Sequence, residues 1–181
     1  MTKITLAVTG SISAYKAADI TSSLGKLGHD VTVLMTEAAQ AFITPMTLQV
    51  LSKRPVHTSV MAEERAEVVN HIDLAKHTEI FLVAPASADT IARLAQGRAD
   101  DIVSSVALAL PQGVKKVIAP AMNTNMYENS LTQRNIQTLK NIGFTEIEPK
   151  IALLACGDLG KGALADVSDI VEKIQEIITN S

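Results

Sequence analysis

Short apolar runs alternate along the chain with longer stretches in which apolar positions recur at helical spacing. The runs are rich in β-branched and aliphatic residues, and they predict five strands, at 4–8, 31–35, 79–84, 116–119 and 144–147. The amphipathic stretches predict helices at 14–27, from 37 onward, and at 46–51, 88–95, 102–110, 131–142 and 167–178. The stretch 53–70 is polar and shows neither period, so it predicts an irregular connection.

The strands are apolar throughout rather than alternating, which indicates burial on both faces. Alternation of such strands with helices is typical of an α/β protein with right-handed crossovers. We therefore predict a three-layer α/β/α sandwich around a Rossmann-like parallel sheet. Because the chain has no repeat, linker or low-complexity tract, residues 1–181 are predicted to form a single domain.

Composition narrows the function classes. The net charge is −3 and basic residues are not clustered, so the sequence predicts no nucleic-acid partner. No apolar run is long enough to span a bilayer, and the N-terminus has no signal-peptide layout, so we expect a cytoplasmic protein that does not enter a membrane. The single cysteine, Cys156, excludes an intrachain disulfide and a thiolate-rich metal site, and no metal is predicted.

Small and polar residues follow three predicted strands, at 10–13, 85–90 and 120–126. Ligands of parallel α/β sheets bind beyond the carboxyl ends of the strands, so these segments predict a site. Gly10 permits close approach of the backbone, and the N–H groups of the following helix start favour an anion such as phosphate. An ordinary turn capped by Ser11 fits equally well. Thr36 could likewise bind phosphate or cap the next helix.

Three further residues carry candidate chemistry, each beside a simpler interpretation. His71 could act as a base, although a lone histidine is more commonly a hydrogen-bonded or surface residue. Asn123 could orient a ligand through its amide or form a turn. Cys156 lies in 155–162 among three glycines, which predicts a mobile loop carrying either a working thiol or an incidental cysteine.

Five segments taken together resemble the homo-oligomeric flavin-containing cysteine decarboxylases. They occur in the order of that family and extend from Thr9 to about Gly162: Gly10-Ser11-Ile12-Ser13-Ala14-Tyr15-Lys16, Asn70-His71-Ile72, Pro85-Ala86-Ser87-Ala88-Asp89-Thr90, Pro120-Ala121-Met122-Asn123-Thr124-Asn125-Met126 and Ala155-Cys156-Gly157.

The resemblance implies a flavodoxin-like flavoprotein that uses FMN to decarboxylate 4′-phosphopantothenoyl-L-cysteine to 4′-phosphopantetheine in coenzyme A synthesis. It implies His71 as the active-site base and Cys156 as the proton donor that completes turnover. It also implies a trimer-based homo-oligomer, up to a dodecamer, with the flavin at a subunit interface. The substrate-binding residues that it implies are Asn123, Met126 and Ala155, and the FMN-binding residues are Gly10, Ser11, Ile12, Thr36, Ser87, Ala88, Asp89, Thr90 and Ala121.

The chain departs from the family pattern at three positions. Asp89 stands where asparagine is usual, Tyr127 where tryptophan is frequent, and Ala163 where a basic residue is common. Lys161 is a candidate to substitute for that missing positive charge.

Four alternatives remain open. A decarboxylase of peptide C-terminal cysteine would need no Cys156, and segment 120–123 argues against a flavin prenyltransferase. Relatives that act by binding a partner protein usually carry acidic tails. A nucleotide-binding module without catalytic activity would require that the five segments have lost their original function.

Overall fold

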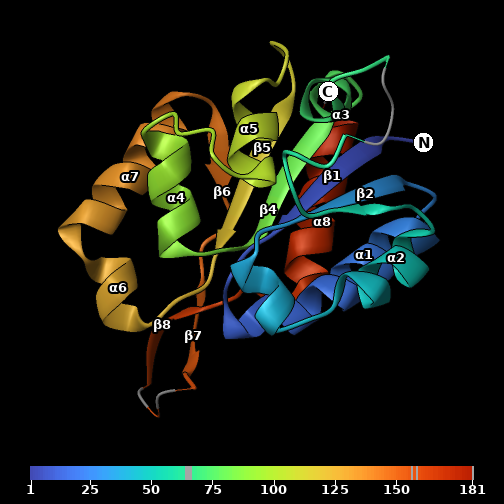
Figure 1. Cartoon of the computed structure of the whole chain (residues 1–181). Coiled ribbons are helices and arrows are strands. Elements are labelled where there is room, and N and C mark those ends of the chain that lie inside the picture. The colour runs from blue at the N-terminus through green and yellow to red at the C-terminus, as the bar shows by residue number, and fades with distance from the viewer. Residues whose placement is uncertain (64–66, 156, 158, 181) are drawn as a thin grey trace.

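The central sheet has six parallel strands in the order β3-β2-β1-β4-β5-β6, as seen in the computed structural model of the chain (Figure 1). The structure describes residues 1–63, 67–155, 157 and 159–180. This is the doubly wound strand order 3-2-1-4-5-6, with its switch point between β1 and β4. The strands are β1 (Lys3–Val8), β2 (Asp30–Met35), β3 (Val56–His57), β4 (Ile80–Ala86), β5 (Lys115–Pro120) and β6 (Phe144–Glu146).

Helices cover both faces of the sheet. Two cores result, one on each side, and β4 is buried along its whole length between them. The three-layer α/β/α prediction is therefore confirmed. One face packs against η1 (Ile12–Lys16), α1 (Ala17–Lys26), η2 (Ala38–Ala41), α2 (Pro45–Ser52) and α8 (Val167–Thr179). The other packs against α3 (Asn70–Lys76), α4 (Ala88–Ala95), α5 (Ile102–Leu108), α6 (Thr124–Glu128) and α7 (Ser130–Asn141).

Local sequence explains where several helices begin. Pro45 is the first residue of α2, directly after the N-cap Thr44. Ser87 caps α4 by accepting a hydrogen bond from the Thr90 N–H at 3.2 Å. Asp101 starts α5 through a capping box with Ser104. Such caps fix the residue at which each helix begins.

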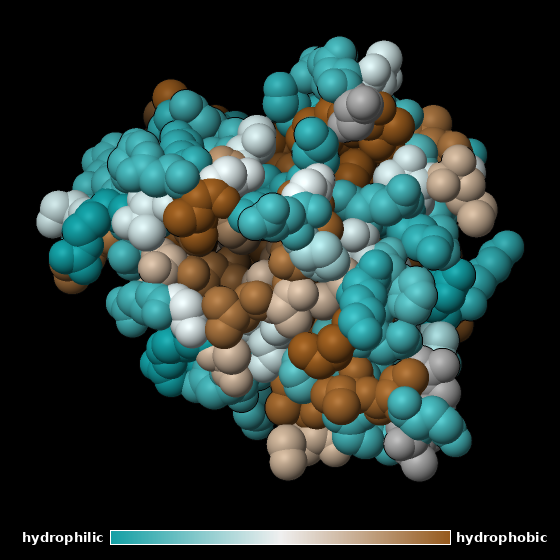
Figure 2. All heavy atoms as spheres, turned by 90° about the horizontal axis from the view of Figure 1, so that it is seen from above, coloured by the Kyte–Doolittle hydropathy of each residue, from teal (hydrophilic) through white to brown (hydrophobic). Residues whose placement is uncertain are grey.

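Polar side chains cover much of the face seen from above in Figure 2, and apolar side chains gather there in separate patches. Within the part of the chain that the structure describes, no helix is both long and apolar enough to cross a bilayer.

Two predictions about connections are wrong. The stretch 53–70 was expected to be irregular, but it contains the edge strand β3, and α3 begins at its last residue. The expected glycine-rich loop over 155–162 is partly a strand, because β7 (Lys150–Leu153) and β8 (Leu159–Ala163) form an antiparallel hairpin. This hairpin projects from the lower end of the molecule in Figure 1.

The glycines of β8 are required by close packing rather than by mobility. A Cβ on Gly160 would lie 2.2 Å from Thr124 Oγ1, and one on Gly162 would lie 2.2 Å from the carbonyl oxygen of Met122. The Met122 N–H also donates to the Gly162 carbonyl at 2.9 Å. The hairpin is therefore held directly against the segment that follows β5.

We expect Gly162→Ala to destabilise the protein by about 1–3 kcal/mol, because the methyl group must displace the backbone it touches. Urea unfolding measures this as a lower midpoint at unchanged slope. Gly25→Ala is the matched control, because Gly25 lies in α1 with nothing within 4 Å of its added Cβ. That change should raise stability by roughly 0.5–1 kcal/mol. Equal midpoints for the two variants would contradict the packing argument.

Candidate active site

A hollow lies beyond the carboxyl ends of β1, β2, β4 and β5, at the switch point of the sheet. It has a larger part of about 670 Å³ and a smaller part of about 450 Å³. Gly10, Ser87, Ala88 and Met126 line both parts. These volumes are in the range of small-molecule and cofactor sites, roughly 300–1,000 Å³. We call this feature the strand-end hollow.

The structure places around this hollow every residue that the resemblance implies for binding FMN and substrate. The larger part is lined by Gly10, Ser11, Ile12, Ser87, Ala88, Ala121, Asn123, Met126 and Ala155, and the smaller part adds Thr36, Asp89 and Thr90. The segments that follow β1, β2, β4 and β5, together with the β7–β8 hairpin, thus meet at one site.

The turn after β1 is shaped by two local contacts. Ser11 Oγ accepts a hydrogen bond from the Ser13 N–H at 3.3 Å, so Ser11 caps η1. A Cβ on Gly10 would lie 2.6 Å from the Cβ of Ala38, so only glycine lets this turn pack against η2. Thr36 Oγ1 accepts from the Ala39 N–H at 3.2 Å and so binds the first turn of η2, whose N-cap residue is Glu37. The capping interpretation of Ser11 is therefore correct, and both segments still face the hollow.

Thr9 is a positioning residue that the sequence analysis missed. Its fully buried hydroxyl donates to the Pro85 carbonyl at 2.6 Å and accepts from the Ser87 N–H at 2.8 Å. These two bonds join the ends of β1 and β4 across the switch point. The available signal was a hydroxyl residue closing an apolar strand directly before Gly10.

Asp89 is held by an arginine on its own helix. The Arg93 Nε donates to Asp89 Oδ2 at 2.8 Å, and Arg93 Nη1 lies 2.6 Å from Asp100 and 3.7 Å from Asp101. Hydrogen bonds to Asp89 and Asp100 raise the pKa of Arg93. The Arg93 guanidinium in turn lowers the pKa of Asp100. The departure from asparagine at 89 is thus accompanied by a charge partner one helical turn away.

The segment after β5 presents Asn123 and Met126 to the larger part of the hollow. Asn123 Oδ1 accepts from the Asn125 N–H at 2.9 Å and begins α6, so the turn-forming interpretation holds beside any ligand role. Met126 is half exposed. Ala155, from the hairpin that packs against this segment, lines the same part of the hollow.

Tyr127 lies in α6, next to Met126, and is held in place by hydrogen bonds. It is buried, its hydroxyl donates to Glu146 Oε1 at 2.8 Å, and Gln133 Nε2 donates to its backbone carbonyl at 2.6 Å. Burial first, and then the hydrogen bond to Glu146, raises the pKa of the Tyr127 phenol above its usual value of 10. A polar phenol thus occupies the position where tryptophan is frequent.

The raised pKa of Tyr127 predicts a loss of stability at alkaline pH. The phenol keeps its proton more tightly in the folded state, so its contribution is complete below about pH 10 and is lost as the pH rises above that value. The urea midpoint of the wild type should therefore be lower at about pH 11 than at about pH 9, and that of Tyr127→Phe should differ less between the two. Parallel declines would show that Tyr127 does not titrate with unfolding.

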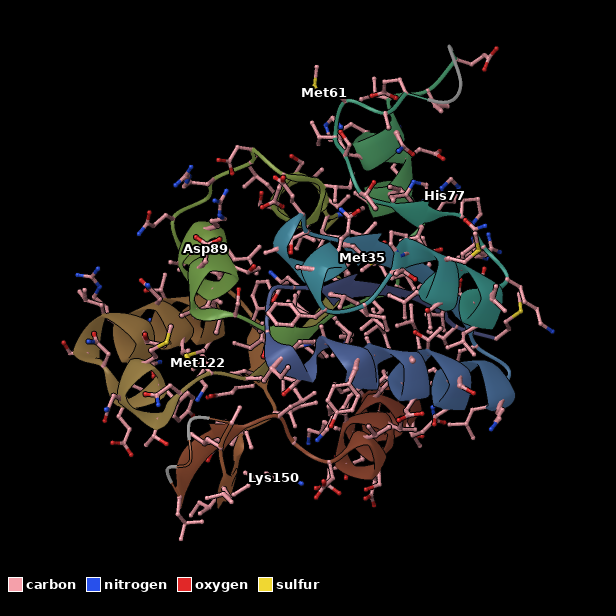
Figure 3. All side chains as sticks on the ribbon, turned by 60° about the horizontal axis from the view of Figure 1, so that its bottom comes forward. Met35, Met61, His77, Asp89, Met122 and Lys150 are labelled. Atoms are coloured by element: carbon pink, nitrogen blue, oxygen red, sulfur yellow. The ribbon has the colours of Figure 1, made fainter. Side chains whose placement is uncertain are left out.

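Of the two residues assigned to chemistry, the structure describes only His71. His71 is the second residue of α3 and does not line the hollow, and its buried Nδ1 has no hydrogen-bond partner among the described residues. In Figure 3, His77 at the end of α3 lies far from Met122 and Lys150. Cys156 lies outside the described residues.

The residues of the hollow fit a phosphorylated ring cofactor. Hydroxyls of Ser11, Thr36 and Ser87 and the capped start of the eight-residue α4 supply hydrogen-bond partners for a phosphate group. None of the described residues that line the larger part carries a carboxylate. Ile12, Met122, Met126, Leu153 and Leu154 give that part apolar walls suited to a flat aromatic ring.

The chain belongs to the flavoprotein family, because the family model described as Flavoprotein matches residues 1–179. It is 62% identical, over 96% of its length, to the probable phosphopantothenoylcysteine decarboxylase of Streptococcus mutans, and it covers 97% of that protein. It is 43% identical, over 93% of its length, to the Coenzyme A biosynthesis bifunctional protein CoaBC of Bacillus subtilis, and it covers 41% of that longer chain.

Comparison with solved structures places the chain in the same family. A PPC decarboxylase with a cysteine-to-serine substitution, complexed with pantothenoylaminoethenethiol, superimposes with a TM-score of 0.87 at 26% identity over 99% of both chains. The FMN binding protein AtHal3 superimposes with a TM-score of 0.85 at 27% identity, over 99% of this chain and 98% of that one. The family prediction made from the five segments is therefore confirmed.

Proposed function

We propose that this protein is an FMN-dependent phosphopantothenoylcysteine decarboxylase, which converts 4′-phosphopantothenoyl-L-cysteine to 4′-phosphopantetheine and CO₂ in coenzyme A synthesis. One observation carries the proposal. The strand-end hollow gathers the implied FMN residues and the implied substrate residues in a chain that is 62% identical to a probable enzyme of this kind. Its place of action is then the cytoplasm, and residues 1–181 act as one domain.

FMN, when bound, supplies the electron acceptor and donor that decarboxylation of an unactivated cysteine requires. The chain supplies the groups that hold FMN in position. Ser11, Thr36 and Ser87, with the N–H groups at the start of α4, hold the phosphate, and the apolar walls exclude water from the ring.

The substrate is oriented by two segments that line the larger part of the hollow. Asn123 lies in the segment after β5 and Ala155 lies in the hairpin, so the cysteine end of the substrate lies beside both. His71 takes up a proton as the base, and Cys156 returns a proton to carbon at the end of the cycle. A base and an acid held beside the substrate transfer protons without first having to reach it by diffusion.

The protein acts as a trimer-based homo-oligomer in this proposal. A single chain leaves His71 outside the hollow that holds Asn123. A second copy that brings its own His71 to this hollow completes the catalytic set, as a flavin at a subunit interface requires.

The test is an absorbance spectrum of the purified protein, followed by addition of substrate. We expect flavin bands near roughly 370 and 450 nm, and a product lighter than the substrate by one CO₂. A peptide ending in cysteine is the control substrate and should not react. A protein that stays colourless and inert with added FMN would refute the proposal.

A further inference from the structure

The two parts of the strand-end hollow differ in charge. The smaller part is lined by Glu37, Asp89, Asp100 and Asp101 around Arg93. In the larger part the only charged residues among those described are two lysines, Lys16 from η1 and Lys150 from the start of β7. The larger part is therefore suited to an anionic ligand at the end where these lysines lie.

Lys150 stands directly across the hairpin from Ala163. The β7–β8 register pairs these two residues, so their side chains lie on neighbouring positions of the same small sheet. The resemblance leads us to expect a basic residue at 163, where Ala163 offers only a methyl group to the hollow. Lys150 supplies a positive charge from the paired position on β7, and it lines the same hollow.

Lys161 does not fill this place. Its ammonium lies 2.5 Å from Glu148 and 5.7 Å from the centre of the Tyr127 ring, and it is not among the residues that line the hollow. The sequence-based suggestion that Lys161 replaces the missing charge is thus not supported by its contacts.

Lys150 has a partner that a stronger anion can replace. Its ammonium pairs with Asp166, whose carboxylate is 56% exposed and does not line the hollow. The hydrogen bond from Lys150, followed by the charges of Lys150 and Lys16, lowers the pKa of Asp166, which places all three groups in one electrostatic neighbourhood. Figure 3 shows Lys150 extending from the hairpin toward α8. An exposed pair of this kind is worth little, so exchange of the carboxylate for a doubly charged phosphate costs little.

We propose that Lys150 is the specificity-determining residue that recognises the phosphate of the phosphorylated substrate, taking over from Asp166 when the substrate binds. This inference rests on the proposed function. In the proposed function the phosphate of FMN has its own donors, Ser11, Thr36 and Ser87, none of which lies on the hairpin. Lys150 instead lies on the hairpin that also carries Ala155, which is the substrate side. The substrate then spans the larger part, with its cysteine near Asn123 and its phosphate at Lys150.

The test compares kcat/KM for 4′-phosphopantothenoylcysteine with kcat/KM for the same compound lacking the phosphate, using the FMN-loaded protein. Lys150→Met should lower the value for the phosphorylated substrate by about tenfold and leave the other unchanged. Asp166→Asn, which removes the competing carboxylate, should not lower it. Ala163→Arg added to Lys150→Met should restore preference for the phosphorylated substrate from the paired position.

Lys161→Met is the matched control, because it removes the other lysine of the hairpin without touching the hollow, and its preference should equal that of the wild type. FMN content, read from the spectrum, confirms that each variant is folded and loaded. A Lys150→Met variant that loses activity on both substrates equally, or on neither, would overturn the inference. If the wild type itself releases CO₂ from neither compound, the proposed function fails, and the inference fails with it.

Discussion

Replacing Cys156 by serine should stop the reaction after decarboxylation, so that an aminoenethiol accumulates in place of 4′-phosphopantetheine. A thiol has an ordinary pKa of about 8.5 and can donate its proton, whereas an aliphatic hydroxyl of the same shape is a much weaker acid. Loss of a positioned general acid typically costs about 10²–10⁴-fold in rate. We expect 4′-phosphopantetheine formation to fall by that factor while release of CO₂ persists.

Mass spectrometry separates the two products, because the aminoenethiol carries two hydrogen atoms fewer than 4′-phosphopantetheine. The aminoenethiol is the more oxidised product, so without oxygen the variant should release only about one CO₂ per bound FMN. Normal yields of 4′-phosphopantetheine from Cys156→Ser would remove the thiol from the mechanism.

The central sheet was predictable because its strands carry their own signal. Ile80–Ala86 is apolar at every position, and in the structure it is buried on both faces between two cores. β3 lacks that signal, because two residues, Val56 and His57, pair only with the edge of β2. An edge pairing this short depends on the neighbouring strand rather than on a local pattern.

The hairpin was missed because glycines have two opposite meanings in a sequence. Gly160 and Gly162 suggested a mobile loop, but they stand where neighbouring atoms leave no room for a side chain. Such close approach is a tertiary property, set by Thr124 and Met122 about forty residues earlier in the chain. Composition alone cannot distinguish it from flexibility.

The site was predictable to the extent that strand ends determine it. Parallel strands end at the same edge of a sheet, so the segments after β1, β4 and β5 had to meet, and the structure shows that they do. Thr9 was missed because its two hydrogen bonds reach a segment 76 and 78 residues away. His71 belongs to no strand end, which is why neither its local pattern nor the fold of one chain brings it to the hollow.

Replacing His71 by asparagine should abolish release of CO₂, because the variant keeps a hydrogen-bonding side chain but loses the base. The expected loss is about 10²–10⁴-fold in kcat, measured as CO₂ evolved from 4′-phosphopantothenoylcysteine, with FMN content unchanged. His77→Asn is the matched control, because His77 ends the same helix and its Nδ1 lies 2.8 Å from the Asp73 carbonyl. Wild-type turnover by His71→Asn would remove His71 from catalysis.

The same variant tests whether the hollow is completed by a second copy. Asn123→Asp should also be inactive, because it alters the substrate wall. If a hollow takes Asn123 from one copy and His71 from the next, co-expression of the two inactive variants creates some hollows in which both residues are intact. Random mixing of equal amounts in a cyclic trimer gives about one quarter of the wild-type activity. If each hollow instead used its own His71, every hollow would contain one defect and the mixture would stay inactive. Recovery of activity would therefore establish that the active site lies between subunits, which a single chain cannot reveal.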